Sequence, residues 1–330
     1  MSLPPILEDL YRDIRSQLEV VEDEIRGALD TEHEAVRTMV DHLGGYQGKR
    51  LRPALVMILA RASGADLSDV RFPRLGAVVE MIHLATLVHD DVIDEAVLRR
   101  RRETVNARWS NYDAVLLGDI VFSRAIRLLG RIGDQRALIT LTGAVSTLCE
   151  GEILQNRHRR DADLREETYY RIIEDKTAIL YASACELAAH LGGASDEMVS
   201  AFRCYGLELG KAFQIVDDCL DMTGTEREVG KSLGTDLRLG KMTLPLILLR
   251  EEGGEECRRL LERIIAAPDP DPRDLSDLKT ALLERGAIAG ALDRARRHAG
   301  EAVTAVRPHV DPRTLACLEA VSTFVFERRT

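Results

Sequence analysis

The chain has few aromatic residues and no long apolar run. Phe, Trp and Tyr make up 4% of its 330 residues, and Trp occurs once. No stretch of ~18 consecutive apolar residues occurs, so no segment is expected to span a bilayer. The opening residues, MSLPPILEDLYRDI, lack the basic and apolar regions of a secretory signal peptide. These absences predict a soluble, cytoplasmic protein.

Paired cysteines and an excess of positive charge are also missing. The six cysteines are scattered without a CxxC pair, which is typical of reduced, buried thiols in a cytosolic protein. The formal net charge is −10, with 45 Lys and Arg against 55 Asp and Glu, so a nucleic-acid surface is not expected. A chain of this charge that handles anions needs local basic residues or bound metal ions.

The composition favours helices, because Ala, Leu, Glu and Arg dominate a chain that is 45% apolar. Sustained strand alternation, sequence repeats and low-complexity tracts are absent. Helical periodicity predicts helices over residues 5–30, 31–43, 54–60, 111–131, 134–158, 165–192 and 196–223, with another beginning near residue 72 and amphipathic helices over 242–330. Length alone would favour two domains. The pattern instead predicts one all-α domain over residues 1–330.

The stretch 84–100, LATLVHDDVIDEAVLRR, carries three aspartates on an apolar helical run. Asp90 and Asp94 lie one turn apart on one face of the helix. Two like charges at this spacing cost a few tenths of a kcal/mol in an isolated helix. A divalent cation is the simplest group that would offset this cost.

Residues 213–221, FQIVDDCLD, repeat the same DDxxD pattern with Asp217, Asp218 and Asp221. One such motif alone is more often a solvated helix face than a site. Carboxylates embedded in apolar sequence, however, are rarely only solvated. Neither motif has the glycine-bearing twelve-residue spacing of an EF-hand. Two copies therefore predict two acidic helix faces that meet in the fold and share metal ions.

Basic residues flank the acidic motifs. Residues 48–53, GKRLRP, place three cations at a helix start, where an arriving anion would offset their repulsion by the helix dipole. A four-arginine run at 99–102 follows the first acidic motif, and arginine suits bidentate phosphate recognition. His83 lies about two turns before Asp90 on the same face, and it is either a buried core histidine or a contact for the substrate. For the basic residues of GKRLRP, phosphate binding is favoured over a solvated turn.

Polar residues continue through the second half. Lys176 and Thr177 lie inside an apolar-periodic helix, and a buried lysine needs a partner such as an anion. Gln214 precedes the second acidic motif by one turn. A glycine-rich loop, EVGKSLGTDLRLGKMTLP, brings Lys231 and Lys241 next to that motif, although it lacks the spacing of a P-loop.

The motifs and their order resemble those of the trans-type polyprenyl diphosphate synthases. In chain order they are GKRLRP, HDDVID with trailing arginines, KTA, GKAFQIVDDCLD, GK, GTD and GKMTLP. The motifs span about residues 44–250. The resemblance implies a homodimeric bundle of long helices around a deep central cavity. It also implies a Mg²⁺-dependent prenyltransferase that joins isopentenyl diphosphate to an allylic prenyl diphosphate, giving an all-trans polyprenyl diphosphate and pyrophosphate.

The resemblance also implies a role for each motif residue. Metal ions would be bound by Asp90, Asp94 and Asp217 directly, with Asp91, Asp218 and Asp221 assisting. Isopentenyl diphosphate would be bound by Lys49, Arg52, His83 and Arg100. The allylic diphosphate would be bound by Arg99, Lys176, Lys231 and Lys241. The reacting centre would be lined by Lys176, Thr177 and Gln214.

Two positions bear on loop conformation and product length. Relatives usually have glycine after the two arginines that follow the first motif, where this chain has Arg101. In the family, a bulky aromatic at the position of Ala85 closes the cavity early. Alanine there predicts a long product of about C30 to C50, with a C15 to C20 synthase as the alternative. A bulky side chain from another helix could instead close the cavity and limit the length of the product.

Three other functions explain the motifs less well. A terpene cyclase shares the first acidic motif but not the second or the basic motifs. A non-catalytic partner subunit of a heteromeric synthase should have lost motif residues, and none is missing here. A simple cation-binding helical protein would leave the ordered lysines and arginines unexplained. The sequence therefore predicts the synthase.

Overall fold

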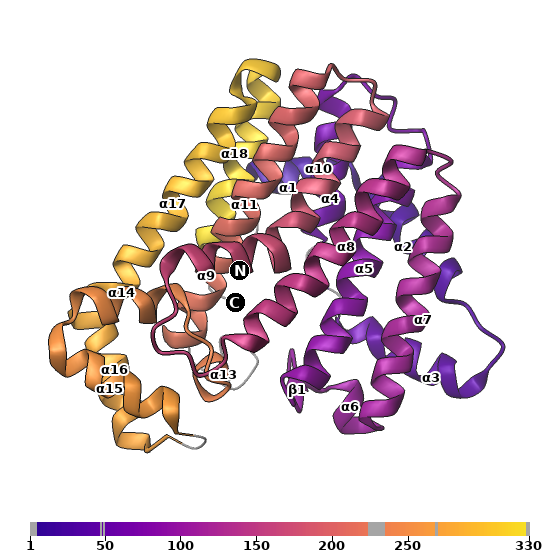
Figure 1. The fold of residues 1–330 in the computed structure, drawn as a ribbon. Coiled ribbons are helices and arrows are strands. Elements are labelled where there is room, and N and C mark those ends of the chain that lie inside the picture. Colours follow the sequence, from indigo (N-terminus) through magenta and orange to yellow (C-terminus); the bar gives the residue numbers. More distant parts are fainter. Residues whose placement is uncertain (1–4, 47, 49, 224–234, 268–269, 328–330) are drawn as a thin grey trace.

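The structure is a computed structural model that describes residues 5–46, 48, 50–223, 235–267 and 270–327. Its regular structure is almost entirely helical, which confirms the predicted all-α class. Figure 1 shows the long helices lying alongside one another, with the segment from α14 to α16 projecting at one lower corner. Lys49 and Lys231 lie outside the described residues.

In the first half of the chain, the described residues form eight helices, a 3-10 turn and one small hairpin. They are α1 (Pro5–Asp13), α2 (Arg15–Leu29), α3 (Glu34–Leu43), the 3-10 turn η1 (Gly44–Tyr46), α4 (Leu51–Ala62), α5 (Arg71–Ile93), β1 (Leu98–Arg99), β2 (Arg102–Glu103), α6 (Val105–Arg108), α7 (Asn111–Gly130) and α8 (Gln135–Arg157). The helix predicted over 5–30 is therefore two helices, divided at Ile14, whose backbone (φ −107°, ψ 13°) leaves the helical region.

The second half is helical throughout its described part. Its elements are α9 (Glu166–Ile173), the π-helical turn η2 (Glu174–Ala178), α10 (Ile179–Leu191), α11 (Asp196–Thr223), α13 (Thr235–Arg238), α14 (Leu244–Glu252), α15 (Gly254–Ala266), α16 (Pro272–Glu284), α17 (Ala287–Val306), the 3-10 turn η3 (Arg307–His309) and α18 (Pro312–Glu327). The single helix predicted over 165–192 is thus interrupted by a π turn that contains Lys176 and Thr177. Such turns occur frequently at functional sites.

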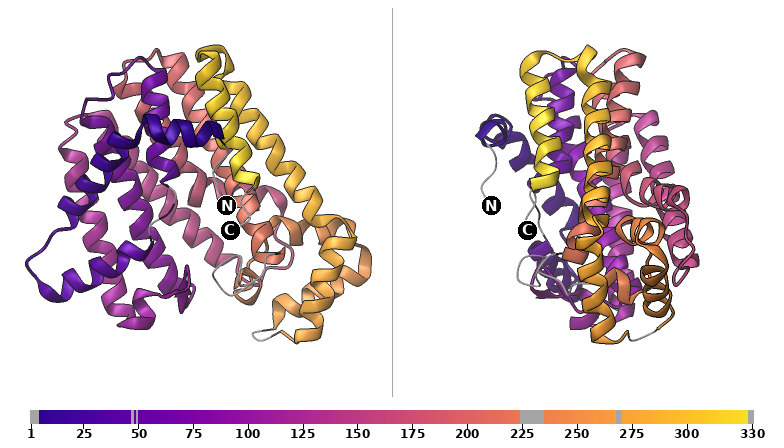
Figure 2. Two further views of the ribbon diagram at one scale, coloured as in Figure 1. Left: turned by 180° about the vertical axis from the view of Figure 1, so that it is seen from behind. Right: turned by 90° about the vertical axis from the view of Figure 1, so that its left-hand side faces the viewer.

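The helix α11 organises the core, because its most extensive contacts are with α10 and α17. Close approach to α10 depends on Gly206, where a Cβ would lie 2.5 Å from the carbonyl O of Tyr181. The first and last helices also meet, since α1 contacts α18 and Arg313 Nη2 lies 2.6 Å from Asp13 Oδ2. In Figure 2 the indigo helix α1 runs crosswise to the yellow helix α18.

The hairpin shows which backbone conformation Arg101 must adopt. Arg99 pairs with Arg102, so Arg100 and Arg101 form the two-residue loop. Their φ values are 50° and 64°, which is the left-handed backbone that such loops require and that glycine adopts most easily. Glycine at position 101 would satisfy this geometry without strain, whereas Arg101 holds it with a bulky side chain.

By length and composition, α8 alone among the described helices could cross a membrane. Only 28% of its most apolar window is buried inside the chain. Its exposed apolar side chains include Ile139 and Ile153, which are 63% and 61% exposed. They lie about four turns apart on one face of the helix, which also carries the exposed polar residues Thr142, Ser146 and Glu150 between them.

We predict that Gly206→Ala lowers the free energy of unfolding by about 1–3 kcal/mol, the usual cost of overpacking, because the added methyl group collides with the backbone of α10. Chemical denaturation followed by circular dichroism measures this change. Gly300→Ala is the matched control, since it lies in α17 with open space around it and should gain about 0.5–1 kcal/mol. Equal changes in the two variants would contradict the packing argument.

Candidate active site

The two acidic motifs occupy equivalent places, at the C-terminal ends of two long helices. Asp90 and Asp91 are in the last turn of α5, and Asp94 is the residue that ends it. Asp217, Asp218 and Asp221 are within the last two turns of α11. The C-terminal end of a helix carries partial negative charge. Each motif therefore adds carboxylates where the helix itself already disfavours them.

In the first motif, one aspartate is buried and paired. Asp91 is 1% exposed and accepts hydrogen bonds from Arg99, whose Nη2 lies 2.8 Å and Nε 2.9 Å from Oδ1. The hydroxyl of Tyr46 lies 3.3 Å from Oδ2. Burial raises the pKa of Asp91, and the Arg99 guanidinium opposes this shift. The pKa of Asp90 is also raised by burial, against the opposing charge of Lys176.

The second motif repeats this division. Asp218 is 4% exposed; its Oδ2 accepts from the Tyr169 hydroxyl at 2.6 Å and its Oδ1 from Gln214 Nε2 at 2.8 Å. Gln214 Oε1 in turn accepts from the Thr177 hydroxyl at 2.8 Å. Burial, and next the charge of Asp236, raises the pKa of Asp218 to about 8. These bonds fix the orientations of Thr177 and Gln214, the two residues predicted to line the reacting centre.

Lys241 links the two motifs. Its Nζ lies 2.9 Å from Asp94 Oδ2 in the first motif and 3.4 Å from Asp236 Oδ1. The backbone N of Asp236 donates to Oδ2 of Asp221 in the second motif at 3.2 Å. The structure therefore brings together two motifs that lie far apart in the sequence, through one buried lysine and one additional aspartate.

Lys176 projects from the π turn toward the first motif. It pairs with Glu152 and donates to Gln155 Oε1 at 2.9 Å, both on α8. Burial alone would lower the pKa of Lys176, but Asp90 and Glu152 raise it above the usual range. Lys176 is thus a cation held beside carboxylates. A pocket of about 60 Å³ is lined by Lys176, Thr177, Gln214, Asp218 and Lys241.

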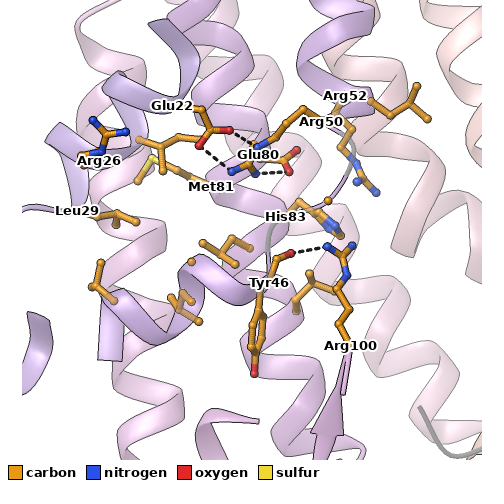
Figure 3. A pocket seen from close by; sticks show the side chains of 18 of the residues that line it. Glu22, Arg26, Leu29, Tyr46, Arg50, Arg52, Glu80, Met81, His83 and Arg100 are labelled. Atoms are coloured by element: carbon orange, nitrogen blue, oxygen red, sulfur yellow. Dashed lines mark hydrogen bonds and ion pairs between the residues drawn. The ribbon is translucent and has the colours of Figure 1, made fainter. Parts of the chain in front are cut away.

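A much larger cavity, of about 1340 Å³, opens between α5, α11 and the N-terminal helices. Its lining includes Arg52, His83, Arg100 and Asp217, together with apolar side chains from α5 and α11. Figure 3 shows Arg52, His83 and Arg100 on one side of it. The Arg52 guanidinium lies 4.4 Å from the ring centre of Tyr181. Burial, and next the charge of Arg52, lowers the pKa of His83 well below its usual value, so this histidine is neutral.

Arg50, the second cation of GKRLRP, is paired with carboxylates. Arg50 precedes α4 with φ 52° and pairs with Glu80 at 2.7 Å and with Glu22 on α2 (Figure 3). These carboxylates neutralise its charge, so Arg50 joins α2 to α5. Arg52, which the resemblance assigns to isopentenyl diphosphate, lines the same cavity as Arg50.

Ala85, the residue used to predict product length, is 2% exposed and is not part of the lining of the large cavity. On α5 that lining comes from Glu80, Met81, His83, Leu84 and Leu87. The α5 face that bears Ala85 is packed inside the bundle.

Four site residues were missed by sequence reasoning: Tyr46, Glu152, Tyr169 and Arg159. The tyrosines and Glu152 have partners far away in the sequence, so no spacing rule could find them. Arg159 lies in the charged run NRHRRD after α8, and its Nη2 reaches Asp94 Oδ1 at 3.1 Å. That charge run was the only sequence signal.

Comparisons with known proteins identify the family of this chain. Residues 33–282 match the family model polyprenyl synthetase. The chain is 37% identical over 289 residues to heptaprenyl diphosphate synthase component 2 of Geobacillus stearothermophilus, covering 86% of each chain. It is 34% identical over 273 residues to octaprenyl diphosphate synthase of Escherichia coli (strain K12), covering 82% of this chain and 84% of that protein.

Solved structures show the same fold. The polyprenyl synthase of Caulobacter crescentus CB15, complexed with calcium and isoprenyl diphosphate, superposes with a TM-score of 0.94 at 34% identity, over 100% of both chains. A decaprenyl diphosphate synthase of Rhodobacter capsulatus superposes with a TM-score of 0.90 at 35% identity, over 98% of this chain and 99% of that one. The chain therefore belongs to the polyprenyl synthetase family and is a prenyltransferase with its all-α fold.

Proposed function

We propose that this protein is a Mg²⁺-dependent synthase that joins isopentenyl diphosphate to an allylic diphosphate and makes a long all-trans polyprenyl diphosphate. One observation carries the proposal. Two carboxylate motifs, joined through Lys241, lie next to a large cavity that Arg52, His83 and Arg100 line. Acidic groups for metal ions and basic groups for diphosphates are thus supplied side by side, in an interior suited to an apolar chain.

The donor set fits Mg²⁺, which prefers oxygen ligands and binds through a few carboxylates plus substrate phosphates. Asp90, Asp94 and Asp217 would hold the ions. Asp91 and Asp218 are engaged by Arg99 and by Tyr169, so they would orient neighbouring groups. When bound, the ions stabilise the charge that develops on the leaving diphosphate.

The chain's own residues would act around that leaving group. Lys176 and Lys241 supply positive charge where the allylic diphosphate departs, while Arg52 and Arg100 hold the diphosphate of the second substrate. Thr177 and Gln214 present oriented oxygens to the cationic carbon, and the apolar cavity wall keeps water away from it. The neutral imidazole of His83 lies among arginines and is a contact for isopentenyl diphosphate. The departing pyrophosphate accepts the proton that is released.

We predict that the purified protein, with Mg²⁺ and labelled isopentenyl diphosphate, elongates allylic primers and loses this activity with a metal chelator. Asp90→Asn should lower kcat about 100-fold or more, a loss typical of removing transition-state charge stabilisation. Chromatography of the dephosphorylated products measures both effects. Asp293→Asn, an exposed carboxylate on α17, is the control. Absence of product with every primer would reject the proposal and favour a non-catalytic partner subunit.

The long product is supported by relatives named as heptaprenyl, octaprenyl and decaprenyl synthases. Ala85 is packed inside the bundle and does not line the cavity. We predict that Ala85→Phe shortens the product from about C30–C50 toward C15–C20, because the ring would push neighbouring residues of α5 into the cavity below the first acidic motif. Product chromatography measures chain length, with thermal unfolding as the check on folding. An unchanged length in a folded Ala85→Phe variant would move the cavity floor to another helix.

We also propose a cytoplasmic homodimer joined through α7 and α8. These adjacent helices expose apolar side chains that include Leu116 (58%), Ile139 (63%) and Ile153 (61%). Exposed apolar side chains gathered on neighbouring helices are typical of interaction sites. A second copy of the chain would cover these side chains, including the two exposed isoleucines of α8.

We predict that Leu116→Glu combined with Ile139→Glu converts a dimer into a monomer of 36.7 kDa, because buried charges would have no partners. Size-exclusion chromatography with light scattering measures the mass. Leu283→Glu is the matched control, since Leu283 is 56% exposed on α16 and should leave the dimer intact. A monomeric wild-type protein would reject this interface.

A further inference from the structure

Two arginines in the described part of the chain share an unusual feature. The Nε atoms of Arg52 and Arg159 are shielded from solvent and have no hydrogen-bond acceptor. Leaving a buried donor unpaired is costly, so each guanidinium retains a donor for a ligand. Arg52 lines the large cavity, where the proposed function places a diphosphate. Arg159 belongs to no motif.

Arg159 shares a carboxylate with Lys241. Arg159 Nη2 lies 3.1 Å from Oδ1 of Asp94, and Lys241 Nζ lies 2.9 Å from Oδ2 of the same group. Arg159 Nη2 also lies 3.4 Å from the carbonyl O of Ile93. Two cations, one following α8 and one preceding α14, are therefore held at the end of α5. Asp236 is a second carboxylate near Lys241, at 3.4 Å, so an anion would be attracted here by the unpaired Nε donor of Arg159 and not by an excess of positive charge.

The backbone keeps these two cations together. Arg160 N donates to the carbonyl O of Gly240 at 2.7 Å, so the residues next to Arg159 and to Lys241 are bonded directly. The contact is tight, because a Cβ at Gly240 would lie 2.6 Å from Arg160 Cγ. Arg160 Nη1 also donates to the carbonyl O atoms of Ile265 and Ala267, at 2.9 Å and 2.7 Å. The segment that carries Arg159 is thus anchored on two sides.

We propose that Arg159 is a further diphosphate-binding residue, which holds the allylic diphosphate together with Lys241 at the first acidic motif. This inference rests on the proposed function. Nε and Nη2 form one edge of the guanidinium fork, and such an edge binds two phosphate oxygens at once. In Arg159 that edge has a single carboxylate contact and one donor without an acceptor.

The competing explanation is that Arg159 only neutralises Asp94. Measuring the affinity for inorganic pyrophosphate separates the two roles, because pyrophosphate has the diphosphate group that Arg159 would bind but no prenyl chain. Calorimetric titration with pyrophosphate would use Mg²⁺ and saturating isopentenyl diphosphate, which occupies the other diphosphate site. Steady-state rates would give KM for each substrate separately.

We predict that Arg159→Gln weakens pyrophosphate binding about tenfold and raises KM for the allylic substrate similarly, with KM for isopentenyl diphosphate unchanged. Arg159→Lys should be intermediate, because lysine keeps the charge but loses the fork. Arg157→Gln is the matched control. It removes the same charge from an exposed side chain two residues earlier and should bind pyrophosphate as the wild-type protein does.

Several outcomes would overturn the inference. Pyrophosphate affinity in Arg159→Gln equal to that of Arg157→Gln would leave Arg159 with a purely structural role. An equal rise of both KM values would indicate general distortion of the site. If Arg159→Gln does not fold, Arg159→Lys provides the test. Pyrophosphate affinity and KM values equal to those of the wild-type protein in Arg159→Lys would show that the guanidinium fork does not bind the diphosphate. A wild-type protein that binds pyrophosphate but forms no product would instead reject the proposed function.

Discussion

Carboxylates gathered at the negative ends of two buried helices are the constraint on which this structure depends. Repulsion within each DDxxD motif adds to repulsion by the helix dipole, and burial raises the pKa values of Asp90, Asp91 and Asp218 further. Such a cluster persists only with compensating groups. The surrounding elements supply them: Arg99 from the hairpin, Lys176 from the π turn, and Lys241 from the chain that follows α13.

The compensation divides each motif into two kinds of aspartate. The second aspartate is buried against a tyrosine hydroxyl and one further donor: Arg99 at Asp91 and Gln214 at Asp218. Fixing one carboxylate in place also fixes the helix turn that carries the others. This is a means of preorganisation, because ligands whose positions are already set lose little conformational entropy on binding. The DDxxD spacing on each of the two helices therefore gives the same result: a buried, hydrogen-bonded second aspartate, and other aspartates that are held in place by it.

Much of this was predictable because its signals are local. Helical periodicity gave most helices, and the order of motifs gave the family. The structure brought Asp94, Lys241 and Asp221 into one connected group, as the two repeated motifs predicted. The features that the sequence did not indicate depend on tertiary structure. No local pattern indicates that Glu22 and Glu80 pair with Arg50, or that a π turn interrupts the helix predicted over 165–192.

The sign of the charge explains why such a site would need both metal ions and arginines. A diphosphate is repelled by the carboxylates of both motifs, so binding requires that the local field be inverted. A bound divalent cation is the largest charge in such a site and inverts it at the carboxylates. Lysine and arginine then bind the outer oxygens. Lys241 and Arg159 already occupy Asp94, so a cation that takes this carboxylate would free both side chains for the anion. Under the proposed function, the lysine and arginine that stabilise the carboxylate of Asp94 would thus become the residues that hold the substrate.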